Sequence, residues 1–251
     1  MEALFNALIA AAVVSLISLI GVFTLALKHK TLDKIIILLI ALSAGTLLGG
    51  AFLHLIPESI EEFGTESTIF SLLIGFCAFF LIERVLFWHH CHMHGGECQV
   101  HTFTYMNLIG DALHNFLDGI IIAASFLVSF PVGIATTVAV IAHEIPQEIG
   151  DFGVLIYGGF SKTKALLYNF ASALMAVLGV LVGYYLSSSV EVFHPFLVPF
   201  AAGGFIYIGA SDLIPQLHKE PKISKSIQSF SVFIFGLLLM FALKIILESQ
   251  F

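Results

Sequence analysis

Charged residues are scarce in this 251-residue chain: Asp, Glu, Lys and Arg together make up 11% of it, against 59% hydrophobic residues. A soluble domain needs a much larger polar surface, so this composition excludes a soluble globular protein and predicts an integral membrane protein. The mean hydropathy of +1.02 agrees with that prediction. We expect the lipid bilayer as a partner and no nucleic acid.

Cysteine and tryptophan are also rare. The three cysteines, Cys77, Cys91 and Cys98, are too few for a disulfide scaffold. Two of them lie in a histidine-rich segment, where metal contact is the expected use. The chain has one Trp but 25 Phe, which fits side chains that face lipid and neighbouring helices. No basic leader precedes the first apolar run, so we expect no cleavable signal peptide.

Long apolar runs dominate the rest of the chain. A bilayer core about 30 Å thick requires roughly 20 apolar residues per helix, and eight runs meet that length. Runs this long without strict alternation predict helices and exclude a β-barrel. We therefore expect an all-α integral membrane protein with eight transmembrane helices, forming a single transmembrane domain of residues 1–251. The expected helices are 3–27, 32–54, 67–87, 103–127, 131–158, 163–186, 194–217 and 227–248.

The few basic residues predict the topology. Nine of the ten lie at odd-numbered connections between the expected helices, and the even-numbered connections have none. By the positive-inside rule the odd connections are cytoplasmic, so both termini are expected outside the cytoplasm. The acidic second connection, PESIEEFGTES, is then also outside. Because no targeting extension is evident, we expect the plasma (inner) membrane. The nine residues are Lys28, Lys30, Lys34, Arg84, Lys162, Lys164, Lys219, Lys222 and Lys225.

Two segments of the chain resemble each other. AGTLLGGAFLHLIPE (44–58) and AGGFIYIGASDLIPQ (202–216) share their AG start and the LIP near their ends, with His54 opposite Asp212. They lie on the second and seventh expected helices, which must run in opposite directions. This predicts an inverted repeat, common in transporters, with a 3+2+3 arrangement of helices 1–3 and 6–8 around helices 4–5. The alternative is two similar small-residue packing faces.

Ionisable residues interrupt the fourth and fifth expected helices. GDALHNFLDG (110–119) and HEIPQEIGDF (143–152) place them near the middle of otherwise apolar runs. One such group at the centre of a spanning helix costs roughly 2.5–3.5 kcal/mol, so a cluster of them needs compensation. His114 and Asp118 share one helix face, as do His143 and Gln147. Pro146 removes a helical hydrogen bond and is expected to bend the fifth helix.

These residue types predict a metal site. Neutral imidazole with carboxylate oxygen suits Zn²⁺, Fe²⁺, Mn²⁺ or Cd²⁺ better than Mg²⁺ or Cu⁺. We interpret the cluster as the replacement for the hydration shell of a divalent cation that crosses the membrane. The alternative is a polar network that only ties the two helices together. The candidate ligands are His114, Asn115, Asp118, His143, Glu144, Gln147 and Glu148.

The same motifs resemble a known family. HNFLDG (114–119) and HEIPQEIGDFG (143–153) are similar to the paired signature helices of the Zrt/Irt-like (ZIP) metal transporters, closest to the subfamily whose fifth helix reads HEIPHE. The resemblance implies a transporter, not an enzyme, that imports Zn²⁺, or alternatively Fe²⁺, Mn²⁺ or Cd²⁺, with no organic cofactor. It also implies an elevator-like or rocking movement of helices 1, 4, 5 and 6 against the rest. The implied ligands are His114, Asp118, His143 and Glu144, with Asn115 and Glu148 close by.

This chain departs from the family pattern at two points. Gln147 replaces the second His of HEIPHE, so an amide oxygen stands where relatives have an imidazole. Some relatives complete a second metal site with an acid on helix 6, and residues 163–186 contain no carboxylate. We therefore expect one principal site and not a full binuclear pair.

The third connection, 88–102, is rich in His and Cys. Its glycine pair and lack of periodicity predict a cytoplasmic loop, and such tracts are typical metal binders. We hypothesise that it collects released ions or senses cytosolic zinc; the alternative is an incidental polar linker. Its candidate ligands are His89, His90, Cys91, His92, His94, Cys98 and His101. Further polar groups predict a pathway from the outer to the inner surface: His54, Asp111, Asp151 and Asp212.

Two rival functions follow from the same residues. His143-Glu144 begins the HExxH pattern of zinc hydrolases, but Gln147 occupies the position of the second ligand. A haem protein would also place His pairs on facing helices, although clustered carboxylates disfavour an apolar haem pocket. Small-residue faces such as AGTLLGG would suit a homodimer or internal packing equally well.

Overall fold

The computed structural model describes residues 2–21, 29–92 and 101–248, and does not describe the side chains of 29–34, 86–92, 135, 187–194 and 247–248. Every regular element in these ranges is helical, as expected. Three of the long helices contain a short change of pitch. The elements are α1 (Glu2–Ile17), η1 (Ser18–Gly21), α3 (His29–Gly49), η2 (Gly50–Leu55), α4 (Ile56–Phe63), α5 (Thr65–His92), α6 (Thr102–Val128), α7 (Phe130–Tyr157), α8 (Lys162–Ala173), α9 (Met175–Tyr185), α10 (Ser187–Tyr207), η3 (Ile208–Leu213), α11 (Ile214–Leu217) and α12 (Ile223–Glu248).

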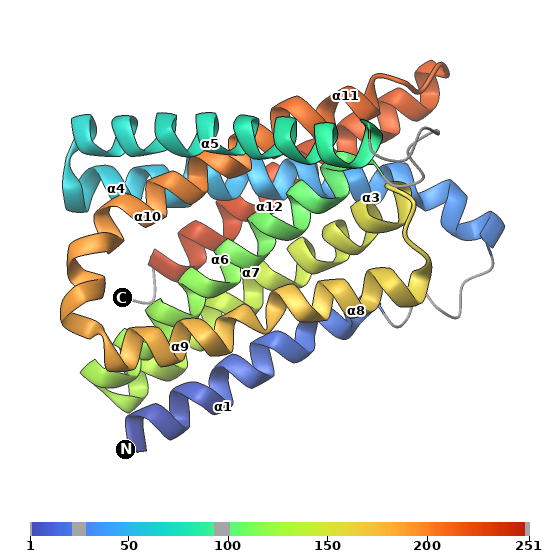
Figure 1. The fold of residues 1–251 in the computed structure, drawn as a ribbon. Helices are drawn as coiled ribbons and strands as arrows, with labels where there is room; N and C mark the ends of the chain where they lie inside the picture. The colour runs from blue at the N-terminus through green and yellow to red at the C-terminus, as the bar shows by residue number, and fades with distance from the viewer. Residues whose placement is uncertain (1, 22–28, 93–100, 249–251) are drawn as a thin grey trace.

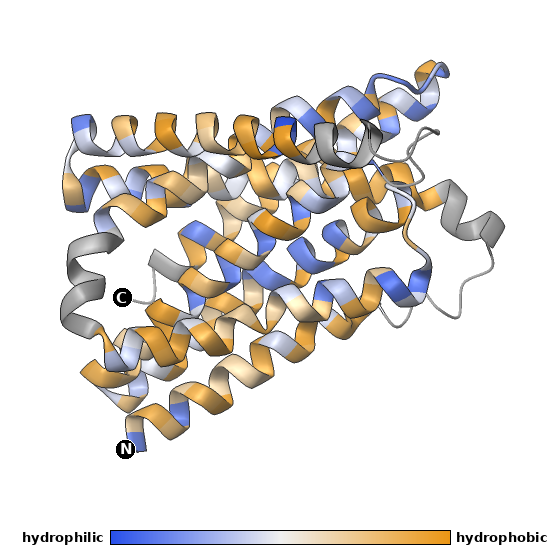
Figure 2. Ribbon diagram, in the orientation of Figure 1, coloured by the Kyte–Doolittle hydropathy of each residue, from blue (hydrophilic) through white to orange (hydrophobic). Residues whose placement is uncertain are grey.

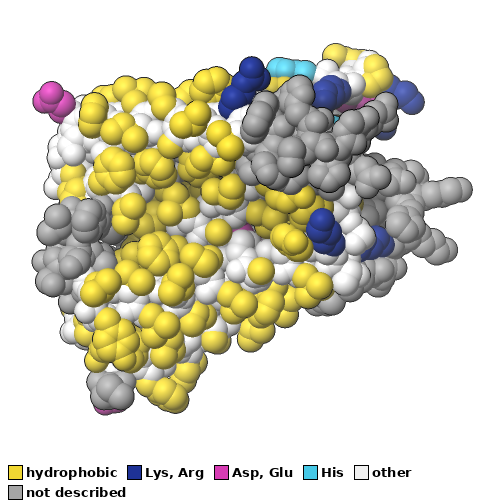
Figure 3. Space-filling model, in the orientation of Figure 1, with side chains coloured by type: hydrophobic (Ala, Val, Ile, Leu, Met, Phe, Trp, Pro, Cys, Tyr) yellow, Lys and Arg dark blue, Asp and Glu magenta, His cyan; other side chains and the backbone are white. Residues whose placement is uncertain are grey.

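Membrane-spanning length and apolar composition coincide in most of these helices. Within the described ranges, seven helical segments are long and apolar enough to cross a bilayer. α7, at 28 residues, is the eighth long helix, and its ionisable residues interrupt an otherwise apolar sequence. Large apolar side chains cover much of the outer surface in Figure 3. The prediction of an all-α membrane protein is therefore confirmed.

Three expected helix boundaries were wrong. The second expected helix ends at 54, but α4 continues it without a break to Phe63. α5 continues to His92, and α10 begins at Ser187, directly after a single residue that separates it from α9. The expected ends at 87 and 194 were placed where the apolar run stops. A helix can continue beyond the lipid because water or polar groups then surround its side chains, so hydropathy underestimates helix length at the surface.

The internal repeat is also present in the backbone. When Ala44 is aligned with Ala202, the π-helical segments η2 and η3 coincide residue for residue. Each is followed by a helix with proline in its first turn, Pro57 in α4 and Pro215 in α11. π-Helical turns are rare, so two at equivalent positions argue against the alternative of two merely similar packing faces.

Close helix contacts follow the same repeat. A Cβ added to Gly45 of α3 would lie 2.3 Å from the Phe233 carbonyl oxygen of α12. A Cβ added to Gly203 of α10 would lie 2.1 Å from the Leu72 carbonyl oxygen of α5. Gly45 and Gly203 occupy equivalent positions of the repeat, so the α3–α12 and α5–α10 crossings are related pairs.

The helices form two groups that meet at the centre. α1, α8 and α9 pack with α6 and α7, whereas α12 packs against α3 and α5 packs against α10, and the segments η2 and η3 join these two pairs. In Figure 1, α6 and α7 run between α5 on one side of the bundle and α1 on the other. The main contact between the groups is α3 against α7. In Figure 2 the outer helices are mostly apolar, and hydrophilic residues cluster midway along the central helices.

The two ends of the bundle differ in charge. The α7–α8 and α11–α12 connections lie at one end, and the start of α1 and the end of α12 lie toward the other (Figure 1). Lys and Arg side chains gather at the first end in Figure 3. These two odd-numbered connections therefore share one end of the bundle; the placement of the first and third connections, and which end faces the cytoplasm, remain predictions.

Candidate metal centre

α6 and α7 form an antiparallel hairpin joined by a single residue. Ser129 ends α6 and caps α7, where its side chain accepts a hydrogen bond from the Val132 N–H at 3.4 Å. Because the hairpin is so tight, residues equally distant from Ser129 lie at the same level. His114 and Glu144 are such a pair. The turn therefore sets the level at which the polar groups of the two helices meet.

The polar face of α6 is buried. Asp111, His114, Asn115 and Asp118 recur at helical spacing and are at most 7% exposed. On α7, Glu144 is fully buried, whereas His143 is partly exposed. Burial of ionisable groups at this density requires partners or a bound ion.

One hydrogen bond orients His143. Its Nδ1 lies 3.1 Å from the carbonyl oxygen of Ala139, one turn earlier in α7. When Nδ1 donates its proton there, Nε2 keeps its lone pair and is free to bind a metal. On the other helix, the ring of Phe205 packs edge-on against His114, with centroids 5.1 Å apart. Both imidazoles are therefore held by neighbours outside the cluster.

Four side chains converge on one point: His114, Asp118, His143 and Glu144. The two Nε2 atoms are 3.2 Å apart. Asp118 Oδ2 lies 3.1 Å from Nε2 of His143 and 3.8 Å from that of His114. Glu144 Oε1 lies 3.3 Å from Nε2 of His114 and 3.7 Å from that of His143. A tetrahedral zinc ion with bonds of about 2.0–2.1 Å separates its ligand atoms by about 3.3 Å, which is the range found here.

The other predicted ligands have different neighbours. The Asn115 amide donates to Asp111 Oδ1 at 3.0 Å. Glu148 is hydrogen-bonded by Asn169 of α8, and it groups with Asp111 and Glu144 instead of with the histidines. Gln147 is buried, and its Nε2 has no hydrogen-bond partner.

The predicted pathway residues are scattered over several helices. Asp151 Oδ1 accepts a hydrogen bond from Ser43 of α3 at 3.1 Å. His54 Nε2 bonds the carbonyl oxygen of Met240 at 2.8 Å. Asp212 is buried in η3. They lie on both helix groups, and Asp111 alone joins a cluster of metal-ligating groups in the described part of the chain.

Most of the histidine-rich connection lies outside the residues that the structure describes. His94 and Cys98 lie outside the described residues, and so do the side chains of His89, His90, Cys91 and His92 at the end of α5. His101 is exposed and stacks on Phe103, with ring centroids 5.3 Å apart. Metal binding by this connection remains a prediction.

Sequence reasoning missed the residues that support the cluster from other helices. Asn169 and Ser172 of α8 hydrogen-bond Glu148 and Asp111, and Phe205 of α10 packs on His114. Asn169 and Ser172 are polar, three apart and within an apolar helix, a spacing that could have singled them out. Nothing in the sequence pairs Phe205 with His114.

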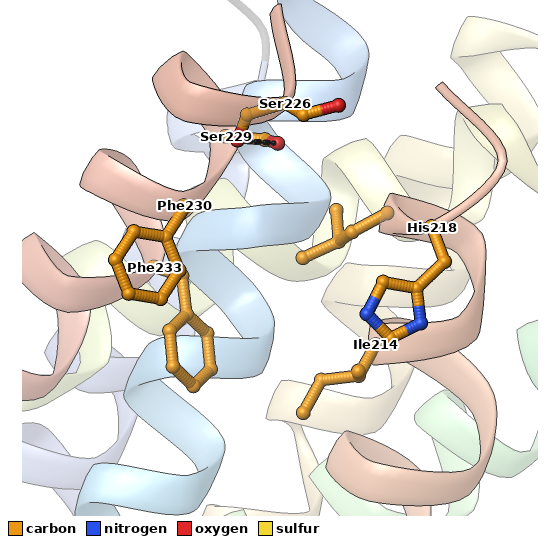
Figure 4. Close-up of a pocket in the computed structure, with 7 residues that line it drawn as sticks. Ile214, His218, Ser226, Ser229, Phe230 and Phe233 are labelled. Atoms are coloured by element: carbon orange, nitrogen blue, oxygen red, sulfur yellow. Dashed lines mark hydrogen bonds between the residues drawn. The ribbon is translucent and has the colours of Figure 1, made fainter. Parts of the chain in front are cut away.

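A separate cavity lies away from this centre. It has a volume of about 340 Å³ and is lined by Ile214, Leu217, His218 and by residues of α12 from Ser226 to Phe233. Figure 4 shows Ser226, Ser229, Phe230 and Phe233 on one side of the cavity and Ile214 and His218 on the other. Its lining is largely apolar and includes none of the residues that converge between α6 and α7.

These features define a multi-pass α-helical membrane protein that buries a cluster of metal-ligating side chains. The family described as ZIP zinc transporter matches residues 1–97 and 88–244. The chain is 32% identical over 254 residues to "Zinc transporter YKE4" of Saccharomyces cerevisiae, covering 88% of this chain and 73% of that protein. It therefore belongs to the ZIP zinc transporter family and is a metal-ion transporter, not an enzyme.

Two further relatives are also named as zinc transporters. The chain is 29% identical over 253 residues to "Zinc transporter ZIP13" of Mus musculus, covering 84% of this chain and 70% of that protein. It is 35% identical over 141 residues to "Zinc transporter ZIP10" of Homo sapiens, covering 52% of this chain and 17% of that protein. The family assignment therefore excludes the alternative that the protein is a zinc hydrolase.

Proposed function

We propose that this protein carries Zn²⁺ into the cytoplasm through the cluster of His114, Asp118, His143 and Glu144. The convergence of two imidazole nitrogens and two carboxylate oxygens, at separations of 3.1–3.8 Å, is the observation on which the proposal rests. The cluster belongs to two adjacent helices and lies near the middle of each, so an ion held there would be far from both surfaces.

The donor set fits an ion in transit. Two imidazoles and two carboxylates suit Zn²⁺, and also Fe²⁺, Mn²⁺ or Cd²⁺. The absence of thiolate from the four ligands avoids the very tight binding of structural zinc sites, and an ion that must leave needs moderate affinity. Zn²⁺ is therefore the substrate of this protein and not a resident cofactor.

The proposed direction follows from the charged ends. The end with the lysines is the cytoplasmic one under the positive-inside rule. Glu58, Glu61, Glu62 and Glu66 lie on α4 and at the start of α5, near the opposite end, where they would concentrate cations. Ions would enter there, pass His54 and the central cluster, and leave past Asp111, Asp151 and Asp212. Both termini would then be outside the cytoplasm, in a plasma membrane.

The proposed movement is between the two helix groups. The α3–α7 contact that joins them has small residues on α7: Gly150 lies against Ser43 and Gly153 against Leu39. Small residues at a helix contact allow close approach and sliding. The group of α1, α6, α7, α8 and α9 would carry the ion past the other group. A homodimer and a role for residues 88–102 in collecting or sensing zinc remain part of the proposal.

Uptake of Zn²⁺ into proteoliposomes that enclose a zinc-sensitive dye tests the site. His143→Ala and Asp118→Ala each remove a ligand atom at the point of convergence, so we expect uptake to fall at least tenfold. The matched control is His218→Ala, which removes an imidazole from the cavity of Figure 4 and should retain uptake. Unaltered uptake by His143→Ala, in protein that elutes as one folded species, would reject the site.

A further inference from the structure

The cavity of Figure 4 lies between two helices that follow each other in the chain. Ile214, Leu217 and His218 form one wall, and residues of α12 from Ser226 to Phe233 form the other. α11 and α12 both pack against α3, but they do not pack extensively against each other. This arrangement leaves a space of about 340 Å³ between them.

The internal repeat explains why α11 and α12 stay apart. The equivalent helix of the first half, α4, has 8 residues, is joined to α5 by Gly64 alone and packs directly against α5. α11 has 4 residues, and the longer connection 218–222 separates it from α12. The shorter helix and the longer connection therefore open the cavity at the end of the bundle with the lysines.

The lining of the cavity changes from polar to apolar with depth. His218 and Ser226 lie nearest the connection 218–222, whereas Ile214 and Phe233 lie further along their helices. From the start of α12 to Phe233 the helix rises about 15 Å, which is half of a hydrocarbon core about 30 Å thick. A polar mouth above an apolar interior is also the order of polarity in one leaflet of a bilayer.

The wall on α12 belongs to the outer surface of the bundle. Phe230, which lines the cavity, is 62% exposed, and Ile223 and Ile227 on the preceding turns are exposed as well. An apolar cavity of about 150 Å³ inside a protein stays dry and binds apolar molecules. In a bilayer, the apolar molecules that reach such a surface are lipid acyl chains.

Basic residues surround the polar mouth. Lys219, Lys222 and Lys225 are exposed, and Glu220 is the single acid among residues 213–247. Glu220 pairs with Lys225, with Oε2 and Nζ 3.5 Å apart. Three lysines against one carboxylate leave positive charge where a lipid headgroup would lie. Basic pockets between transmembrane helices on the cytoplasmic side are typical sites for anionic headgroups.

We propose that this cavity binds one anionic phospholipid, with an acyl chain between α11 and α12 and the phosphate beside Lys222 and Lys225. The lipid joins two helices that have little contact of their own. It also holds α11, which directly follows η3 and Asp212. The proposal does not depend on the ion that is carried, so its failure would leave the proposed transport of Zn²⁺ unchanged.

Native mass spectrometry of the full-length protein tests the binding. Protein in detergent is mixed with phosphatidylglycerol, or with phosphatidylcholine that has the same acyl chains. We expect one strongly retained phosphatidylglycerol per chain and weaker retention of phosphatidylcholine, and an excess of inorganic phosphate should not displace the lipid. Equal retention of both lipids, retention of neither, or displacement by phosphate would overturn the proposal.

Paired lysine variants test the headgroup end. Lys222→Gln with Lys225→Gln should weaken phosphatidylglycerol binding about tenfold, because it removes the charge beside the phosphate. The matched control, Lys162→Gln with Lys164→Gln, removes the same charge from the α7–α8 connection at the same end of the bundle and should leave binding unchanged. An equal loss in both double variants would show a general attraction of charge and would contradict a site.

A cavity-filling variant tests the acyl-chain end. Ser229 is buried and lines the cavity, so Ser229→Phe should abolish the retained phosphatidylglycerol. Ser231→Phe makes the same change at an exposed position of α12 that does not line the cavity, and it should retain the lipid. Retention by folded Ser229→Phe would mean that the lipid touches the surface lysines alone, which would reject the cavity site. The lysine pairs keep the test decisive if Ser229→Phe does not fold.

Discussion

At the scale of single residues, one hydrogen bond decides what His143 can do. The Nδ1 contact with the Ala139 carbonyl, at 3.1 Å, is made within the same helix and depends only on the four-residue spacing. It leaves Nε2 for Asp118, His114 or an ion. A lone buried histidine could serve packing alone, but a fixed tautomer beside a second imidazole and two carboxylates is the usual preparation of a metal ligand.

Gln147 is the residue at which this chain departs from the HEIPHE pattern. It lies one turn after His143, is 3% exposed, and has an unpartnered Nε2. Replacing it by His would add an imidazole next to the cluster. For Gln147→His we expect roughly tenfold tighter Zn²⁺ binding, about 1.4 kcal/mol, and a narrower preference among Zn²⁺, Cd²⁺, Fe²⁺ and Mn²⁺.

Competition of these four ions in the proteoliposome assay measures the preference, and titration of purified protein measures the affinity. Gln147→Leu serves as the control, because it changes the same buried position without adding a ligand and should give no gain. An unchanged preference in Gln147→His would show that position 147 does not reach the ion.

At the scale of helices, the internal repeat determines how closely pairs of elements cross. Gly45 and Gly203 each face a backbone carbonyl of a neighbouring helix at a distance that leaves no room for a side chain. The sequence comparison of 44–58 with 202–216 showed that these glycines are equivalent. It could not show that α12 and α5 are the helices against which they pack.

Substitution of these two glycines should have parallel effects. Gly45→Ala and Gly203→Ala each force the crossing helices apart, and overpacking of this kind typically costs about 1–3 kcal/mol. We expect both to lower the apparent melting temperature, measured by size-exclusion chromatography after heating. Gly50→Ala is the control, since its nearest neighbour would be Met240 Cε at 3.7 Å, an ordinary contact. If all three variants melt like the native chain, the crossings are looser than described.

At the scale of the whole molecule, the proposed direction of transport depends on the unequal distribution of charge: basic residues lie at one end of the bundle and acidic residues at the other. Labelling with a membrane-impermeant maleimide tests the orientation in cells. In a background with Cys77, Cys91 and Cys98 replaced by Ser, the exposed positions Glu66 and Lys222 can each be changed to Cys. We expect Glu66→Cys to react in intact cells and Lys222→Cys only after permeabilisation. The reverse pattern would mean that the protein is oriented for export.

The division of the bundle into two groups of helices was also predicted from the sequence, although only through the family resemblance. That resemblance implied that helices 1, 4, 5 and 6 move together, and α1, α6, α7, α8 and α9 do pack as one group. The residues by themselves predicted only that the central pair carries the site. The contact of α3 with α7, through Ser43 and Asp151, could not be predicted because 108 positions separate the two residues.

Local physics explains what the sequence determined alone. Apolar length predicted the spans, basic residues predicted which connections share an end, and the four-residue helical period put His114 with Asp118. The tertiary structure decided which atoms can share an ion: the rotation of α6 against α7 brings Glu144 to both histidines and turns Glu148 toward Asp111. Contacts from α8 and α10 also determine which atoms can share an ion. The direction of a side chain at a helix interface depends on packing between segments that are distant in the chain, so the sequence does not reveal it.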